Sequence, residues 1–85
     1  MVRTDVTYGQ LDKALRSLGF TCRLVTRRVE SRVYEHKLTD AMFILPAFPE
    51  TDHVLDYHLL GVRTSLDLYG IADPTEFAAK LTKVG

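Results

Sequence analysis

The feature of this sequence that most constrains its fold is the stretch of residues 31–46, SRVYEHKLTDAMFILP, which has the pattern of two strands joined by a tight turn. Its apolar residues fall in two short runs, Val33 with Tyr34 and then residues 42–45, each bounded by polar residues. A threonine and an aspartate between the runs can bond their own backbone and tighten a turn. The closing proline has no N–H to give to a ladder and is expected to end the second strand. The second run is continuous, which is typical of a strand buried on both faces, or of the middle strand in a small sheet with one face covered.

A helix is predicted over residues 8–18. Thr7 and Gln10 form a capping-box pattern, and Gly19 is the expected helix stop because glycine adopts positive φ without strain. Apolar residues recur at helical spacing inside this segment, at Leu11, Ala14, Leu15 and Leu18. Residues 1–6 are expected to be a frayed lead-in.

Residues 20–25 have the pattern of a first strand, which leads through a turn at residues 26–30 into the hairpin. Alternation places Phe20, Cys22 and Leu24 on one face of this strand. We interpret the cysteine as an inert core residue. Three strands in sequence with short links predict an antiparallel meander.

Two further helices are predicted after a loop at residues 47–53. The first has an apolar row at Leu55, Leu59, Val62, Leu66 and Tyr69. Gly61 interrupts it at a cost of up to ~1 kcal/mol relative to alanine, so this helix either spans the whole row or begins only near Leu60. Gly70 is its expected end. The segment 73–76, Asp-Pro-Thr-Glu, is a strong start for a last helix with Phe77, Ala78 and Leu81 as its buried face.

These elements predict one α+β domain over residues 1–85, in the order α-β-β-β-α-α, with a three-stranded antiparallel sheet backed by helices on one face. The other face is left to solvent or a partner. The composition, with 46% hydrophobic and 26% charged residues, is ordinary for a soluble chain. There is no apolar signal segment, no metal motif and one cysteine, so we expect a cytoplasmic protein without a cofactor.

The net charge is zero, from eleven basic and eleven acidic residues, which counts against strong sequence-independent affinity for nucleic acid. Basic residues nevertheless cluster in residues 23–37. They form either a phosphate-tracking stripe with Tyr34 as a stacking platform, or a solvated strand face. The arginines of this cluster are Arg23, Arg27, Arg28 and Arg32.

The order and spacing of several short motifs resemble the HicA family of bacterial toxins, which are small messenger-RNA interferases with a fold like that of double-stranded-RNA-binding domains. The resemblance covers most of the chain. The motifs are Leu18-Gly19-Phe20 at the end of the early helix, Tyr34 and His36 before a hydrophobic strand that closes in Pro46, and the segment 61–71 followed by a short helix with Phe77. The resemblance implies a dsRBD-like fold, RNA as a substrate and a HicB-like antitoxin as a partner.

The family's signature is a Gly-Ser-His triplet that opens the middle strand and supplies the catalytic histidine. Aligned from Tyr34 and His36 without a gap, the triplet falls on residues 29–31, and shifted by one it falls on residues 30–32, which keeps the serine. Neither register contains a histidine. His36 matches a second, more peripheral histidine, and Lys37 stands where the family has a proline. The resemblance therefore implies the fold more strongly than it implies ribonuclease activity.

Cleavage of RNA through its 2′-hydroxyl needs a group that exchanges protons near neutral pH, and histidine titrates there. Alternation places Arg32, Tyr34 and His36 on one side of the strand, which makes His36 the candidate catalytic residue. The candidate nucleic-acid-binding residues are Arg28, Arg32, Tyr34 and Lys37. The alternative interpretation of His36 is a half-exposed strand histidine without a catalytic task.

The sequence leaves the roles of three residues after the hairpin open. His53 and His58 are interpreted as histidines of the loop surface or the helix start, although His58 could approach a site at the hairpin edge. Phe48 either covers the core or contacts a partner.

Two functions follow. One is a HicA-like RNA-binding domain, or an attenuated ribonuclease, in a toxin–antitoxin-type pair. The alternative is a non-enzymatic interaction module that keeps the fold and binds another protein, or a second copy of this chain, through the open sheet face.

Overall fold

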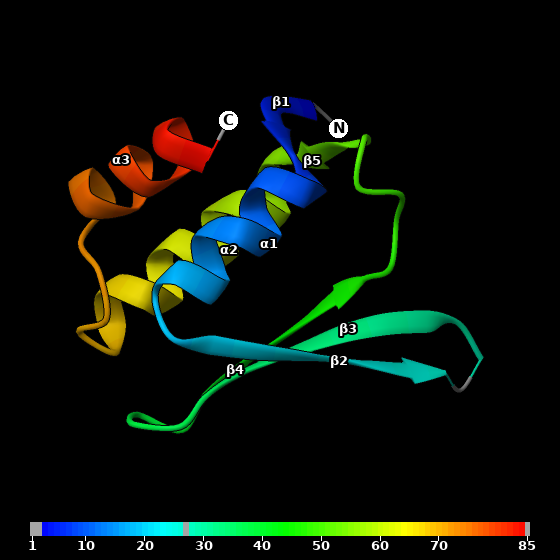
Figure 1. Ribbon diagram of the computed structural model, residues 1–85, viewed down its shortest axis with the longest axis horizontal. Coiled ribbons are helices and arrows are strands. Elements are labelled where there is room, and N and C mark those ends of the chain that lie inside the picture. The colour runs from blue at the N-terminus through cyan, green and yellow to red at the C-terminus, as the bar shows by residue number, and fades with distance from the viewer. Residues whose placement is uncertain (1–2, 27, 85) are drawn as a thin grey trace.

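The computed structural model describes residues 3–26 and 28–84, with side chains described as far as residue 81. Figure 1 shows a layer of helices above a curved sheet. In chain order the elements are β1 (Arg3–Thr7), α1 (Tyr8–Ser17), β2 (Phe20–Thr26), β3 (Glu30–His36), β4 (Ala41–Pro46), β5 (His53–Leu55), α2 (Asp56–Leu68) and α3 (Pro74–Val84). The predicted α+β class is confirmed.

Strands β2, β3 and β4 form the predicted antiparallel meander, in the order β2-β3-β4. The middle strand is β3, so the prediction that the continuous apolar run belongs to a middle strand, or to one buried on both faces, is wrong. In β4 burial alternates: Phe43 is buried, whereas Met42 and Ile44 are 55% and 63% exposed. The run is continuous, but helices cover only one face of the sheet, so only every second residue reaches the core.

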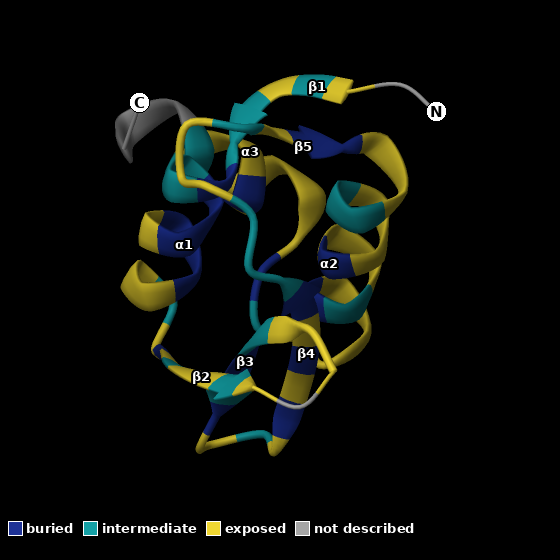
Figure 2. Cartoon of the chain, turned by 90° about the vertical axis from the view of Figure 1, so that its right-hand side faces the viewer, coloured by how far each residue is buried: buried dark blue, intermediate teal, exposed yellow. Residues whose placement is uncertain are grey.

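Helices α1 and α2 lie against the sheet, and α3 packs on α1 and α2. Figure 2 shows buried residues concentrated where the helices and the sheet face each other. Side chains from both layers form one core, which includes Leu11, Leu15, Tyr34, Phe43, Val54, Val62, Leu66 and Phe77. The apolar rows predicted for the helices therefore meet the inward face of the sheet, as expected for a two-layer domain.

A second sheet of two strands, β1 and β5, was not predicted. The expectation of a frayed lead-in is therefore wrong for residues 3–6, which belong to β1; residues 1 and 2 lie outside the described residues. Thr4 Oγ1 donates to the carbonyl of Val54 at 2.9 Å, and the N–H of Tyr8 donates to Asp52 O at 2.9 Å. Both strands are short and pair across about fifty residues of sequence, so neither has a local signal.

The helix boundaries follow the predicted end signals. Thr7 and Gln10 form the capping box, Gly19 has φ +97° and Gly70 has φ +69°. The prediction that α2 could begin only near residue 60 is wrong, because α2 starts at Asp56 and continues through the internal glycine. At α3 the N–H of Glu76 donates to Asp73 Oδ1 at 2.8 Å, which is the predicted cap.

The predicted buried face of α3 is wrong at one residue: Phe77 is buried, as predicted, but Ala78 is exposed. In β2, Leu24 is likewise exposed although it shares a face with buried Phe20. Within the described part of the chain, no helix is long and apolar enough to cross a membrane.

Candidate functional site

The three residues on which the sequence places most weight lie on one face of β3, as predicted. Arg32, Tyr34 and His36 are opposite Leu45, Phe43 and Ala41 of β4 in the ladder, and the strand residues opposite one another share a face. That face is turned toward the helices: Tyr34 is 2% exposed and His36 is 7% exposed. These side chains therefore belong to the core side of the sheet.

His36 is held at both ring nitrogens by other parts of the chain. Its Nε2 lies 3.1 Å from the carbonyl oxygen of Leu18, and its Nδ1 lies 2.9 Å from Thr39 Oγ1. A carbonyl only accepts, so Nε2 carries the proton and donates, and in the neutral ring Nδ1 accepts from the threonine hydroxyl. The ring also packs against Phe20 with centroids 5.0 Å apart. His36 thus ties the β3–β4 turn to the end of α1, and neither nitrogen is free to exchange a proton with a substrate.

Tyr34 joins a polar cluster between β3 and α1. Its hydroxyl donates to Asp12 Oδ1 at 2.6 Å, and Arg16 Nε donates to Asp12 Oδ2 at 2.9 Å. Arg32 NH1 lies 4.0 Å from both Asp12 Oδ1 and Glu50 Oε1. Burial and the hydrogen bond to Asp12 raise the pKa of Tyr34, which keeps the phenol protonated. Two cations and two carboxylates meet here, so the cluster is close to electrically balanced.

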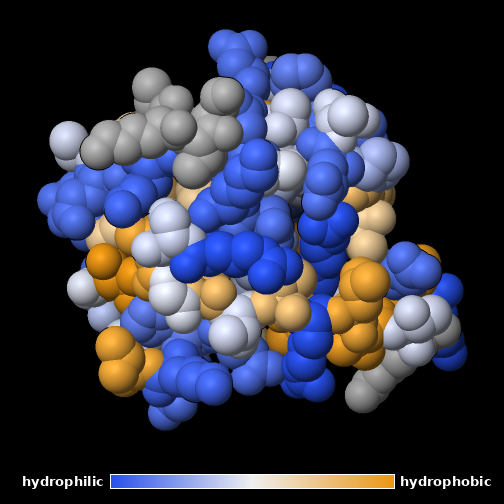
Figure 3. Space-filling model, in the orientation of Figure 1, coloured by the Kyte–Doolittle hydropathy of each residue, from blue (hydrophilic) through white to orange (hydrophobic). Residues whose placement is uncertain are grey.

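Sequence reasoning missed Asp12. The signal is its position directly beside Leu11 of the apolar row of α1, because an acidic residue that is buried there needs a partner. Figure 3 shows hydrophilic side chains over α1 and hydrophobic side chains at several places over the sheet below it. The cluster bonds α1 to the sheet, and this accounts for a buried carboxylate without invoking a ligand.

The remaining predicted binding residues lie at opposite ends of β3. Arg28 is exposed in the β2–β3 link, and Lys37 is exposed in the β3–β4 turn. The strand between them has 7 residues, which span roughly 20 Å. Arg27, the fourth arginine of the predicted stripe, lies outside the described residues. The structure therefore brings Arg32, Tyr34 and His36 together but does not bring Arg28 and Lys37 to them.

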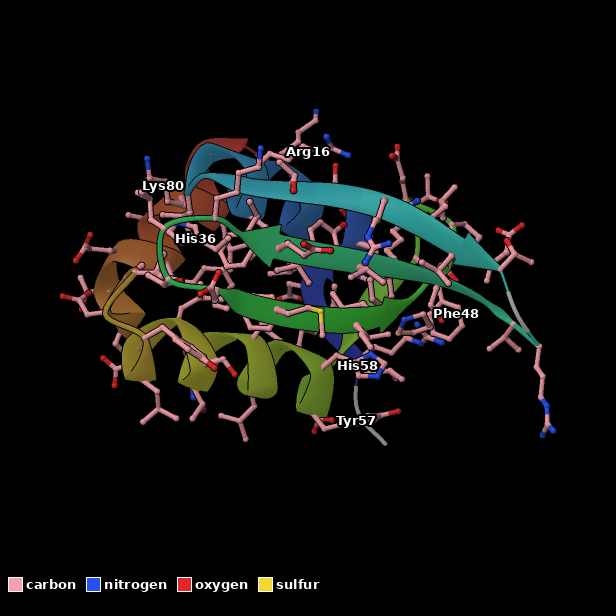
Figure 4. All side chains as sticks on the ribbon, turned by 90° about the horizontal axis from the view of Figure 1, so that it is seen from below. Arg16, His36, Phe48, Tyr57, His58 and Lys80 are labelled. Atoms are coloured by element: carbon pink, nitrogen blue, oxygen red, sulfur yellow. The ribbon has the colours of Figure 1, made fainter. Side chains whose placement is uncertain are left out.

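The other face of the sheet is uncovered. Figure 4 views the molecule from this side, and among the described elements no helix lies in front of β2, β3 and β4. Arg23, Val33 and Ile44 form one cross-strand row on it. A shallow hollow of about 570 Å³ lies over this face, and its lining residues are Arg23, Val25, Arg28, Val29, Ser31, Val33, Met42 and Ile44.

The charges on this face are only partly paired. Arg23 NH2 lies 2.9 Å from Glu35 Oε1 of the neighbouring strand. Among the described residues none pairs with Arg28. The open face thus combines apolar side chains with one free guanidinium at its edge, and no other described element covers it.

An aromatic cluster at the start of α2 determines the roles of Phe48 and His58. The Tyr8 hydroxyl lies 2.9 Å from His58 Nδ1, and the Phe48 ring meets Tyr8 edge-on with centroids 5.4 Å apart. Phe48 packs on the core cluster, which favours its interpretation as a cover of the core. Burial lowers the pKa of His58. His53 lies in β5 at the surface, with Nδ1 2.9 Å from the carbonyl of Thr4.

Cys22 is half-buried beside the core, as its strand position predicts. Across residues 3–26 and 28–81, histidine, cysteine and acidic side chains do not gather in the groups of three or more that could hold a metal ion. Comparisons of this chain with protein-family models, with curated proteins and with solved structures find no match.

Proposed function

We propose that this protein is a non-enzymatic interaction module that binds a partner protein through the uncovered face of its three-stranded sheet. The observation that carries the proposal is the exposure of Met42 and Ile44, at 55% and 63%, beside a hollow with further apolar lining. Complete removal of a side chain of this size from water is worth about 1.5–3 kcal/mol of free energy. Both side chains are more than half exposed in the free protein, so a partner that covers them would gain most of that free energy.

The side chains on the uncovered sheet face indicate what kind of partner would fit it. Arg28 lies at the rim of the hollow without a carboxylate of its own among the described residues. A partner that presents apolar side chains next to an aspartate or glutamate would bury Ile44 and pair with Arg28 at the same time. A HicB-like antitoxin, the partner that the family resemblance implies, would be one protein of this kind.

The buried residues of β3 support a binding rather than a catalytic role. The two ring nitrogens of His36 are bonded to Leu18 and Thr39, and the Tyr34 hydroxyl is bonded to Asp12. A general base must be within hydrogen-bond reach of the proton it takes. Both side chains have structural tasks, so catalysis by them would require the turn or the core to open.

The test is affinity capture from an extract of the source cells with wild-type protein and with the Ile44→Lys variant, followed by binding measurements on each purified partner. We expect Ile44→Lys and Arg28→Glu to weaken binding about tenfold or more. The matched control is Leu38→Lys, since Leu38 is also exposed and apolar but lies in the β3–β4 turn. Binding that responds to Leu38→Lys as strongly as to Ile44→Lys would contradict the proposal.

RNA binding in a toxin–antitoxin-type pair is the second candidate function. It is favoured by Arg23 and Arg28, which line the same hollow, because guanidinium groups can bond phosphates. A phosphate-based mode weakens steeply as salt rises, so a salt titration of binding to a structured messenger RNA distinguishes it from apolar docking.

Cleavage of the same RNA by wild-type protein and by His36→Ala tests the attenuated ribonuclease. We expect no cleavage that depends on His36. Cleavage by the wild type that disappears in a folded His36→Ala variant would instead support the ribonuclease and count against a non-enzymatic module.

A further inference from the structure

Helix α2 carries a second row of apolar side chains on its outer side. The row that faces the core includes Val62 and Leu66, both buried. On the outer side Tyr57 and Leu60 are each 52% exposed and Leu68 is 80% exposed. In Figure 4, Tyr57 lies on the side of α2 away from β4. A helix with apolar residues on opposite sides is typical of one that is covered on both.

The outer row has helical spacing and is nearly free of polar side chains. Apart from one adjacent pair, its positions follow one another at intervals of three or four residues, so they form a single stripe along the helix. We call this stripe the outer α2 surface; it consists of Tyr57, Leu60, Gly61, Thr64 and Leu68. Thr64 is its one polar side chain.

Gly61 in this surface has no explanation within the chain itself. A Cβ added there would meet nothing within 4 Å, and the residue does not have a positive φ. A glycine inside a helix costs about 1 kcal/mol relative to alanine. Its missing side chain leaves a notch beside Leu60, and such a notch lets the side chains of a second helix enter and the two helices pack closely.

Two of the exposed charges of α2, Arg63 and Asp67, complement each other in one alignment of two antiparallel copies. When Leu68 of one copy lies over the notch at Gly61 of the other, Arg63 lies close to Asp67 across the contact, and symmetry repeats both contacts. Arg63 and Asp67 are exposed, and within the described part of the chain neither forms an ion pair. The same alignment thus satisfies the apolar row, the notch and both charges.

We propose that a second copy of this chain docks on the outer α2 surface, with the two α2 helices antiparallel and Leu68 of each in the Gly61 notch of the other. This contact lies away from the uncovered sheet face and does not depend on the function proposed above. Helix α2 has 13 residues and is about 20 Å long. A contact of this length is small, so we expect a reversible dimer with a Kd on the order of micromolar.

Sedimentation equilibrium over a concentration series of the full chain tests the proposal. We expect the wild type to form a dimer and Gly61→Leu, which fills the notch, to be monomeric. Leucine favours helix and Gly61 has open space around it, so this variant should keep the fold, and thermal unfolding checks that it does. The control Leu38→Ser removes an exposed leucine that lies in the β3–β4 turn and is not part of the outer α2 surface, so it should leave the dimer unchanged.

The Arg63–Asp67 pair provides a second, independent test of the proposal. Arg63→Asp should weaken the dimer about tenfold or more, and adding Asp67→Arg to the same chain should restore it, because the pair is then reversed rather than broken. A wild type that is monomeric at every concentration would overturn the proposal, as would a dimer that survives Gly61→Leu. A dimer that Ile44→Lys abolishes while the α2 variants leave it intact would place the contact on the sheet face, and this also overturns it.

Discussion

The phenol of Tyr34 donates a hydrogen bond of 2.6 Å to Oδ1 of Asp12, which bonds the middle strand of the sheet directly to the first helix. Both residues are buried, so water does not compete for the bond. Asp12 Oδ2 also accepts from Arg16, so both oxygens of this buried side chain have hydrogen-bond partners. The pair therefore fixes the position of α1 on the sheet.

Removing the phenolic oxygen should destabilise the fold. We expect Tyr34→Phe to lower the free energy of unfolding by about 1.5–3 kcal/mol, because it removes a hydrogen bond to a charged group while leaving the ring in place. Urea denaturation measures the change. Tyr57→Phe is the matched control, since Tyr57 is half-exposed and its substitution should change stability by less than about 0.5 kcal/mol. Equal effects of the two substitutions would contradict the role of the Tyr34–Asp12 bond.

Two neighbouring residues of β4 should respond very differently to truncation. Phe43 is buried against the ring of Phe20, with centroids 5.0 Å apart, whereas Ile44 points to the uncovered face. We expect Phe43→Ala to cost about 3–5 kcal/mol and Ile44→Ala less than about 1 kcal/mol. Chemical denaturation of the two variants is the measurement. The reverse order would mean that the strand is shifted by one residue, which exchanges its faces.

Replacing glycine with alanine should change the stability of the protein in opposite directions at two positions. Gly19 has φ +97°, and a Cβ there would lie 3.3 Å from His36 Nε2, so Gly19→Ala should destabilise the protein by at least about 1–2 kcal/mol. Gly61 is helical and open, so Gly61→Ala should stabilise the monomer by up to about 1 kcal/mol. Thermal unfolding at low protein concentration compares them. A neutral Gly19→Ala would show that the turn after α1 does not need glycine.

His58 should make stability depend on pH. Burial lowers its pKa below the ordinary value of 6.5, so as the pH falls the unfolded chain binds a proton before the folded chain does. The stability that neutral His58 provides is complete above the unfolded pKa and is lost as the pH falls below it.

The comparison variant is His58→Gln, which can still bond the Tyr8 hydroxyl but does not titrate. We expect wild type to lose more stability than His58→Gln between neutral pH and mildly acidic pH, as measured by urea denaturation at each pH. The two proteins differ only at position 58, so the difference between their pH profiles reports on His58 alone. Parallel pH profiles would show that His58 does not titrate differently on folding.

Local chemistry determined most of the elements of this fold. The capping box at Thr7, the glycine stops at Gly19 and Gly70, and the Asp73 cap act within one helical turn, so a single stretch of sequence contains the whole signal. The period of two in the hairpin and of about four in the helices likewise gave the meander and the layer of helices. The β1–β5 pair escaped prediction because its partners are distant in sequence and its strands are too short for a periodic pattern.

Which side of β3 faces the helices was decided by the tertiary structure. The sequence grouped Arg32, Tyr34 and His36 on one face by alternation, but both faces of that strand mix polar and apolar residues. The choice depended on partners far along the chain: Asp12 for Tyr34 and the Leu18 carbonyl for His36. Buried polar groups require such partners, and only the packed fold shows where they are.

By itself, then, the sequence determined the helices and the three strands of the meander, because turns, caps and periodicity are local properties. The packing of the layers decided which apolar residues remain at the surface. It left Met42 and Ile44 on an uncovered sheet face and Leu60 and Leu68 on the outer side of α2, although their hydropathy alone does not distinguish them from core residues. A side chain is buried only if another element covers it, and coverage is a property of the whole fold.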